Sequence, residues 1–180
     1  MSKFPFGASV PVLGFAAYSG TGKTTLLTRI IPLLRERGLH LAMIKRAHHS
    51  FDVDKPGKDS YELRKAGASQ MLITSDKRWA LMVDLEEERE PRLAELVGRI
   101  DQDRADLILV EGFKHEAFPK IELHRAEVDK PLIHPEDGNI IAIATDSPEV
   151  LDTRLPLLSI NDPTAIADFI MHTVMQEQNP

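Results

Sequence analysis

Residues 12–27 read VLGFAAYSGTGKTTLL, and this stretch decides the class of fold. Its apolar start, VLGFAA, is bounded by Pro11 and by glycines and predicts a short strand buried on both faces. The part from Gly20 to Thr25 fits the phosphate-binding loop pattern G-x-x-x-x-G-K-[ST], except that Ala17 stands at the first glycine. In such a loop, glycine turns aim main-chain N–H groups at phosphate oxygens, and the next helix adds the positive end of its dipole.

The residues after the loop supply the context that a phosphate-binding loop requires. Leucine and isoleucine recur with helical period from Leu26 to Leu34, and Gly38 is a helix stop. Pro32 lies inside this pattern and is expected to kink the helix or to remove a main-chain hydrogen bond. LHLAMIK, residues 39–45, predicts a second strand. Strand, loop, helix and strand together form a βαβ unit.

The loop residues have distinct expected roles. We expect the ammonium of Lys23 to reach the β- and γ-phosphates of a nucleotide and to act in any catalysis, and the Thr24 hydroxyl to coordinate Mg²⁺. Ala17 is compatible with the loop if its main chain avoids positive φ. The alternative is an ordinary Gly- and Thr-rich turn before a helix. The predicted phosphate-binding residues are Ser19, Gly20, Thr21, Gly22, Lys23, Thr24 and Thr25.

Acidic residues after two strands are candidates for metal binding and catalysis. Glu111 follows the apolar run LILV, and a carboxylate at a strand tip can hold the water shell of Mg²⁺ or the attacking water. The alternative for Glu111 is a solvated strand-end charge. After the second strand, Asp52, Asp54 and Asp59 are further candidates, of which we choose Asp54 for the metal. Asp59 has another explanation, because Glu62 three residues later is typical of a capping box.

Base recognition depends on Asp146, which follows the buried run NIIAIAT. Many GTP-binding proteins carry N/T-K-x-D after a late strand, where the aspartate accepts hydrogen bonds from guanine. Here Ala144 occupies the position of the lysine, so Asp146 is a candidate guanine contact without the full signature. The alternative is an aspartate that begins the turn at Ser147-Pro148.

Several cations and histidines near the second strand have less specific assignments. Lys45 and Arg46 could face phosphate or a second anionic ligand. Arg64, past the start of the predicted helix, is expected on a solvated helix face. His48 and His49 suggest zinc or nickel, but adjacent side chains in extended chain point apart and seldom bind one ion together.

The remaining pattern predicts an α/β fold of the phosphate-loop NTPase type, with three layers and a mostly parallel sheet. Residues 71–83 and 120–125 are expected to add an antiparallel portion, and the alternation of KIELHR, residues 120–125, predicts a half-exposed strand. We expect one domain, residues 1–180, with a β-rich dimerisation portion at about 71–83 and 113–135. The further predicted elements are a helix from 59, strands at 71–75 and 78–83, a helix at 91–100, strands at 106–112, 120–125, 139–146 and 155–160, and a final helix opened by 161–163.

Composition excludes several classes of function. The chain has 180 residues and 22 Lys and Arg against 28 Asp and Glu, a net charge of −6, which disfavours sequence-independent nucleic-acid binding. It has no cysteine, so disulfides and thiolate metal sites are excluded. No apolar run reaches the roughly 18 residues of a membrane span, and the prolines near the start do not fit a secretory signal. We expect a soluble, cytoplasmic protein.

Three stretches, in this order and spacing, resemble one known family. They are FAAYSGTGKTTLL, DVDKPGKDSYELRKAGA and DLILVEGFKHE. Their combination resembles the family of molybdopterin-guanine dinucleotide biosynthesis adaptor proteins, the MobB family. The resemblance extends from about Val12 to the final helix.

The resemblance implies a GTP-binding protein that is homodimeric through an extended β-sheet portion. It implies an adaptor, at most a weak GTPase, that assists molybdenum cofactor biosynthesis. The implied partners are the guanylyltransferase that joins GMP to molybdopterin, other molybdenum cofactor biosynthesis proteins, and molybdopterin itself as a candidate ligand. The implied cofactors are GTP and Mg²⁺, with Gly20 to Thr25 on the phosphates, Glu111 as the strand-tip acid and Asp146 as the base contact.

Two other functions remain open at the level of sequence. A small-molecule kinase uses the same loop and βαβ unit, and residues 84–104 contain arginines that a lid over the transferred phosphoryl group would need. The apolar spacing from Leu93 to Ile100, however, favours a packed helix. A metal-insertion chaperone would depend on His48 and His49, and the absence of cysteine argues against it.

Overall fold

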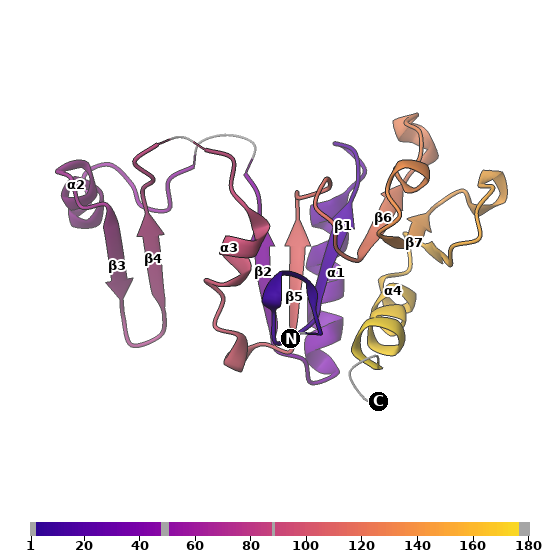
Figure 1. The fold of residues 1–180 in the computed structure, drawn as a ribbon, viewed down its shortest axis with the longest axis horizontal. Coiled ribbons are helices and arrows are strands. Elements are labelled where there is room, and N and C mark those ends of the chain that lie inside the picture. The colour runs from indigo at the N-terminus through magenta and orange to yellow at the C-terminus, as the bar shows by residue number, and fades with distance from the viewer. Residues whose placement is uncertain (1–2, 48–50, 88, 177–180) are drawn as a thin grey trace. The chain divides into compact units, whose positions relative to one another are not determined.

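A computed structural model describes residues 3–47, 51–87 and 89–176. The chain divides into two compact units. Unit 1 comprises Met1–Arg46 and Arg92–Pro180, and unit 2 comprises Ala47–Pro91 (Figure 1). The phosphate-loop stretch and most of the predicted strands therefore belong to unit 1.

Unit 1 is built on a six-stranded sheet in which every neighbouring pair of strands is parallel. The strand order is β2-β5-β1-β6-β7-β8, so the strand that precedes the loop lies near the middle of the sheet. Because all the strands run the same way, their carboxyl ends meet at one edge, where α/β proteins bind ligands. The strands are β1 (Val12–Ala16), β2 (Leu41–Lys45), β5 (Leu107–Glu111), β6 (Lys120–His124), β7 (Ile140–Thr145) and β8 (Leu157–Ser159).

Helices cover both faces of this sheet (Figure 1). On β1, Leu13 and Phe15 pack in one cluster with residues of α1 and α4, while Val12 packs on the other face with residues of α3. The apolar run therefore is buried on both faces, as predicted, and the fold has three layers. The helices are α1 (Lys23–Glu36), α3 (Leu93–Val97), α4 (Pro163–Phe169) and its π-helical continuation η6 (Ile170–Met175), with 3-10 turns η1 (Pro5–Gly7), η2 (Gln102–Arg104), η3 (Ala126–Val128), η4 (His134–Glu136) and η5 (Pro148–Val150).

The expectation that residues 120–125 form a half-exposed antiparallel strand is wrong. Strand β6 is parallel to both of its neighbours, β1 and β7, and is buried. The alternation of polar and apolar residues, which suggested one solvent-exposed face, comes from Lys120 and Glu122. Their side chains are buried but have partners. Lys120 Nζ lies 2.9 Å from Asp137 Oδ2 and donates to the carbonyl of Glu116 at 2.6 Å. Buried charges of this kind are stable only when they are paired.

Glu122 fixes the segment that covers this part of the sheet. Its carboxylate accepts hydrogen bonds from the amides of Ile133 and His134, at 2.6 and 2.8 Å. Burial raises the pKa of Glu122, and these two hydrogen bonds oppose the shift. The polar residues of β6 therefore join the connection after it to the sheet.

The described residues of unit 2 form one short helix and one antiparallel hairpin. The helix is α2 (Asp59–Lys65), and the strands are β3 (Gln70–Thr74) and β4 (Trp79–Val83), with Leu72 directly opposite Leu81. The predicted antiparallel portion at 71–83 is confirmed. The dimerisation role of 71–83 and 113–135 stays a prediction.

Arg64 is the central polar residue of unit 2, and the expected solvated position is wrong. The residue is 7% exposed, and its guanidinium donates to Asp52 at 2.6 Å, Asp54 at 2.7 Å and Asp84 at 3.2 Å. The hydrogen bonds that Arg64 donates, first to Asp54 and then to Asp84, raise its pKa. Three carboxylates thus hold a cation inside a unit that has few buried apolar residues.

Of the two predicted helix starts, one has a side-chain cap in the structure and the other does not. Asp162 caps α4 by accepting from the amides of Thr164 and Ala165, at 3.0 and 3.1 Å. Asp59 is not the cap of α2, because Lys58 occupies that position without a side-chain hydrogen bond. Glu62 instead accepts from the amide of Gly57 at 3.1 Å, one residue further from the helix than a capping box requires.

Candidate nucleotide site

The loop of residues 17–22 joins the carboxyl end of β1 to α1 in a conformation that needs glycine at two positions. Gly20 and Gly22 have φ of +88° and +89°, values that residues with a Cβ seldom adopt. Ala17 is not among the described residues with positive φ. The alanine at the first position of the pattern is therefore compatible with the loop.

The amino end of α1 presents main-chain donors. Leu26 makes the first helical hydrogen bond, donating to the carbonyl of Gly22 at 3.0 Å. The amides of the four preceding residues, 22–25, have no acceptor within the helix, and no side chain caps this end. Together with the helix dipole, these amides favour an anion at this position.

Thr21 braces the middle of the loop from inside. Its side chain is buried, and its hydroxyl donates to the carbonyl of Tyr18 at 2.9 Å. On the outer side, the guanidinium Nε of Arg125 donates to the carbonyl of Thr21 at 3.3 Å. Side-chain contacts from within the loop and from beyond β6 therefore hold the loop in place.

Lys23 is the first residue of α1, and its ammonium has a weak partner. Nζ lies 3.4 Å from the carbonyl oxygen of Ala17. Burial lowers the pKa of Lys23, Glu111 opposes this shift, and the nearby charges of Lys45 and Lys114 add to it. An anion at the loop would offset the cost of holding these cations close together.

Glu111 lies at the end of β5, next to the strand that leads into the loop. It is in register with Phe15 on β1 and with Lys45 on β2. Its carboxylate forms an ion pair with the Lys45 ammonium, 3.0 Å between Oε2 and Nζ. The strand-tip acid predicted from LILVEG therefore lies at the edge of the sheet where the loop lies, and Lys45 is engaged by it.

Asp146 follows β7 at the same edge, on the other side of β1. Its two carboxylate oxygens accept from the amide of Ala126 and from the guanidinium of Arg125, each at 3.1 Å. Arg125 also donates to the side chain of Asn161 at 3.1 Å. The structure thus joins the phosphate loop, through Arg125, to the two connections that follow β7 and β8.

The other sequence candidates lie elsewhere. Asp54 belongs to unit 2, where Arg64 holds one of its oxygens and the other is buried with no hydrogen-bond partner among the described residues. A role for Asp54 on a metal ion stays a prediction. Arg46 places its guanidinium 5.9 Å from the ring centroid of Phe113. His48 and His49 lie outside the described residues.

Residues 92–104 form a packed element of unit 1. Leu93 and Val97 of α3 are buried in the core cluster that contains Val12 and Val110. This agrees with the apolar spacing of the stretch, and it gives no support to a lid in this part of the region 84–104.

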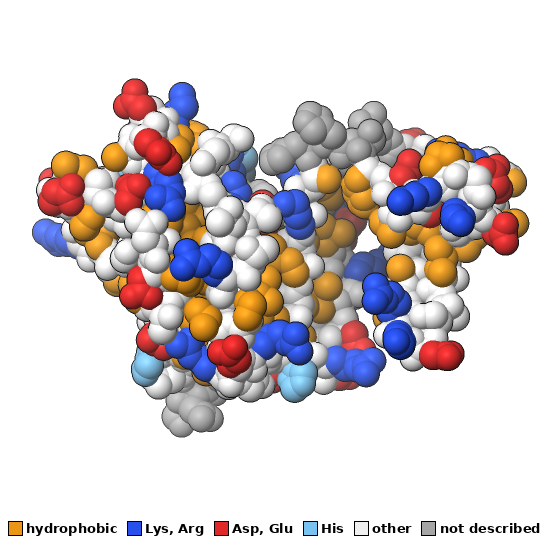
Figure 2. Space-filling view, turned by 180° about the vertical axis from the view of Figure 1, so that it is seen from behind, with side chains coloured by type: hydrophobic (Ala, Val, Ile, Leu, Met, Phe, Trp, Pro, Cys, Tyr) orange, Lys and Arg blue, Asp and Glu red, His pale blue; other side chains and the backbone are white. Residues whose placement is uncertain are grey.

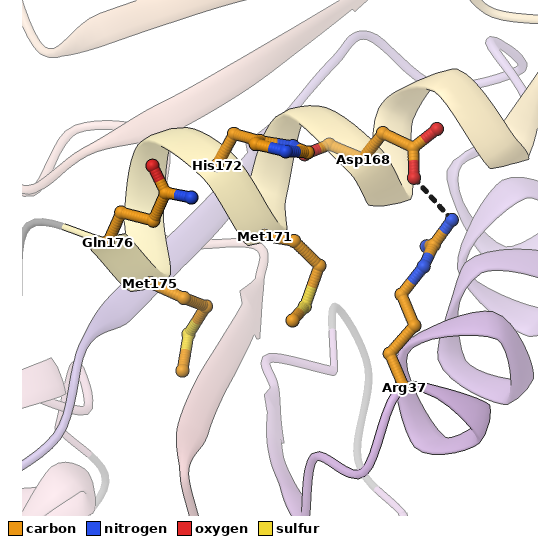
Figure 3. Close-up of a pocket in the computed structure, with 6 residues that line it drawn as sticks. All are labelled: Arg37, Asp168, Met171, His172, Met175 and Gln176. Carbon is orange, nitrogen blue, oxygen red and sulfur yellow. Dashed lines mark hydrogen bonds and ion pairs between the residues drawn. The ribbon is translucent and has the colours of Figure 1, made fainter.

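A hollow of about 750 Å³ lies near the opposite end of α1 (Figure 3). Arg37, the C-cap of α1, pairs there with Asp168 of α4, and Met171 and Met175 extend to the same side of their helix. A helix of 14 residues is about 20 Å long, so this hollow is separate from the loop. The remaining lining residues are His172 and Gln176.

Comparison with known proteins decides the family. The family model described as molybdopterin guanine dinucleotide synthesis protein B, MobB, matches residues 12–146. The chain belongs to this family. The molybdopterin-guanine dinucleotide biosynthesis adapter protein of Escherichia coli K12 is 52% identical to it, over 94% of this chain and 96% of the relative. The adapter protein of Haemophilus influenzae is 47% identical, over 89% of this chain and 88% of the relative.

Solved structures agree with the MobB assignment. A crystal structure titled molybdopterin-guanine biosynthesis protein B superposes with a TM-score of 0.70 at 30% identity, covering 89% of this chain and 97% of that one. HypB from Helicobacter pylori, solved in complex with nickel, has a TM-score of 0.50 at 16% identity over 93% and 88% of the two chains. That second likeness concerns the fold alone.

Two residues near the loop were not recognised in the sequence of this MobB member. Arg125 follows β6 directly, and Lys114 lies three residues past Glu111. Arg125 is the first residue after β6, as Asp146 is the first after β7, but the sequence predicts an antiparallel strand there and so does not place Arg125 at this edge. Lys114 gave no such signal, since its position depends on a turn.

Proposed function

We propose that this chain binds GTP together with Mg²⁺ and acts as an adaptor in the synthesis of molybdopterin guanine dinucleotide. The observation that carries the proposal is the arrangement of groups at the amino end of α1. There, two glycines with positive φ, unpaired amides and the Lys23 ammonium face the same edge of the sheet as Glu111 and Asp146. The similarity to adapter proteins of molybdopterin-guanine dinucleotide biosynthesis supports the pathway.

Each loop group has a proposed role in this site. The amides of residues 19–25 bind phosphate oxygens, and Lys23 balances the charge of the β- and γ-phosphates. The geometry fits such a group, because an anion would give the amides an acceptor that they lack within the helix, and would give the Lys23 ammonium a stronger partner than the carbonyl of Ala17. Thr24 and Glu111 would hold Mg²⁺, which neutralises phosphate charge when it is bound.

Guanine recognition is proposed for Asp146. Arg125 and the amide of Ala126 fix the direction of its carboxylate at the edge of the sheet. A carboxylate held in this way can accept hydrogen bonds from the ring N–H and amino group of guanine, and adenine lacks that pair of donors. Selectivity for GTP over ATP follows from this role.

We propose at most slow hydrolysis. Fast GTPases use an arginine that stabilises charge at the transferred phosphoryl group, an effect of about a thousandfold or more. Arg125 and Arg46, which are near this edge, are held by other groups: Arg125 by Thr21, Asp146 and Asn161, and Arg46 against Phe113. Binding and partner recognition, rather than turnover, are therefore the proposed roles.

The proposed partners are a second copy of the chain and the guanylyltransferase that joins GMP to molybdopterin. Unit 2 supports the first. On one face of its hairpin, Leu72 and Trp79 are 60% and 61% exposed, and hydrophobic side chains are visible at the surface in Figure 2. A two-stranded sheet with an uncovered apolar face is rarely stable alone.

One experiment tests the nucleotide part of the proposal. Affinity and turnover of the purified chain are measured for GTP, GDP and ATP, with and without Mg²⁺. The proposal predicts preferential, Mg²⁺-assisted GTP binding with turnover far below one per second. Failure to bind any nucleotide would contradict it, and ADP formation that depends on an added metabolite would favour a small-molecule kinase.

A further inference from the structure

The four residues that end β5 and follow it, Glu111 to Lys114, form a rigid turn beside the phosphate loop. Gly112 has φ of +110°, and a Cβ at this position would lie 2.7 Å from Arg46 Cβ. The amide of Lys114 donates to the carbonyl of Gly112 at 2.7 Å, which closes a three-residue turn. Phe113, in the middle of this turn, is buried in the core with Val110. The buried phenylalanine therefore fixes where the next residue leaves the sheet.

Lys114 extends from this turn toward the loop. Its ammonium lies 5.6 Å from the ring centroid of Tyr18, which is the second residue after β1. Because Tyr18 belongs to the loop of residues 17–22, this contact places the Lys114 ammonium beside the loop. No described carboxylate lies within ion-pair distance of Lys114, and the side chain is exposed. A second cation is thus held at the loop without an anion of its own.

The strand order tells which end of a nucleotide Lys114 would meet. The loop follows β1, which has β5 on one side and β6 and β7 on the other. Glu111 ends β5 and Lys114 follows it three residues later, so both come from the β5 side. Asp146, the proposed base contact, comes from the β7 side. Lys114 therefore lies toward the phosphate and metal end of the site, away from the base.

We propose that Lys114 is a second phosphate-binding ammonium, which contacts the terminal phosphate of the nucleotide from the β5 side. The inference rests on the proposed nucleotide function and adds to it a residue that distinguishes a triphosphate from a diphosphate. Tyr18 holds the ammonium near its place through the face of its ring. On binding, the ammonium exchanges this ring contact for a charge-assisted hydrogen bond to phosphate.

The test compares GTP and GDP affinities, in Mg²⁺, for the full chain and for Lys114→Ala, Lys114→Arg and Lys77→Ala. Lys77 lies in the exposed turn between β3 and β4 and is the matched control for loss of one positive charge. A lost charge-assisted hydrogen bond weakens binding by roughly tenfold or more. We expect Lys114→Ala to lose this much affinity for GTP and less than about twofold for GDP. Lys114→Arg should keep near-normal affinities for both nucleotides. Lys77→Ala should bind both as the unaltered chain does.

The outcomes separate this inference from the function on which it rests. If the unaltered chain binds GTP and Lys114→Ala binds it equally well, or loses GTP and GDP affinity by the same factor, Lys114 does not contact the terminal phosphate and the proposed function stands. If the unaltered chain binds neither nucleotide, the proposed function fails and the inference fails with it. Circular dichroism of each variant shows that the fold is retained.

Discussion

The guanidinium of Arg125 donates to the main-chain oxygen of Thr21 at 3.3 Å. This contact crosses from the connection after β6 to the middle of the phosphate loop. The same side chain reaches Asp146 and Asn161, each at 3.1 Å. One residue therefore holds together the loop proposed to bind phosphates and the connection proposed to bind the base.

Replacing Arg125 with alanine should weaken GTP binding by roughly tenfold, because both the loop and Asp146 lose a charge-assisted hydrogen bond. Isothermal titration calorimetry measures the change. Arg104→Ala is the matched control, since Arg104 is exposed and lies just before β5, at the opposite edge of the sheet. Unchanged GTP affinity in a folded Arg125→Ala variant would show that this link is not needed for the site.

The Asp146→Asn variant tests base recognition. The amide keeps the size of the side chain but loses the negative charge. The substitution should therefore weaken GTP binding by about 1–3 kcal/mol and ATP binding by much less. Competition binding with both nucleotides gives the ratio of GTP affinity to ATP affinity. Equal losses for GTP and ATP would remove Asp146 from base recognition and leave it a structural partner of Arg125.

Replacing Lys23 with methionine should separate binding from stability. GTP affinity should fall at least about a hundredfold, because the charge that balances the phosphates is gone. The melting temperature of the nucleotide-free protein should stay the same or rise. The reason is that burial lowers the pKa of Lys23, so the charged form is disfavoured in the fold at neutral pH. Retained GTP affinity, or a clear fall in melting temperature, would count against this assignment.

The sequence predicted the strands and the loop well, because both have a local signal. The apolar runs of β1, β5 and β7 and the glycines before Lys23 identify themselves without knowledge of the fold. The order of the strands has no such signal. Only once β1 is known to lie between β5 and β6 can Lys114 and Arg125 be recognised as neighbours of one loop.

Paired buried charges explain two of the errors in the predicted structure, those at Lys120 and Arg64. The pattern predicts a half-exposed strand at 120–125 and a solvated helix face at Arg64, because charged residues are rarely buried. In each case a carboxylate distant in the chain supplies the partner, Asp137 for Lys120 and Asp84 for Arg64. Such pairing depends on tertiary structure, and one sequence does not reveal it.

The Lys120–Asp137 pair gives a prediction on stability. Asp137→Asn leaves the Lys120 ammonium, 1% exposed, with two carbonyls and no counter-charge, and should cost about 3 kcal/mol of unfolding free energy at pH 7. Burial tends to raise the pKa of Asp137, but hydrogen bonds from Lys120 and Asn139 outweigh it and hold the pKa below 3.8.

The pH dependence of that effect follows from the sign of the shift. Because the folded pKa is depressed, the contribution is complete above 3.8 and is lost as the pH falls through the folded value. Urea unfolding of the unaltered chain and of Asp137→Asn should therefore converge in strong acid. Asp152→Asn, an exposed carboxylate, should unfold like the unaltered chain at every pH. A constant difference between the chain and Asp137→Asn would contradict the assignment.

The proposed dimer depends on the exposed face of the β3–β4 hairpin. Leu72 and Leu81 lie directly opposite each other, and both are exposed. Leu72→Asp should convert a dimer at micromolar concentration into a monomer, because a carboxylate would be buried without a partner. Sedimentation equilibrium measures the mass, with Asp76→Ser in the turn as the control. A monomeric unaltered chain would contradict the dimer itself.

The main-chain amides at the start of α1 are the groups on which the proposed nucleotide binding depends most. A titration of the ¹⁵N-labelled protein with GTP and Mg²⁺, followed by amide resonances, tests them directly. We predict that the amides of Gly20, Gly22, Lys23 and Thr24 shift strongly and saturably, and that they do not shift in Lys23→Met. Amides that stay unchanged in the unaltered protein at millimolar GTP would contradict the central claim.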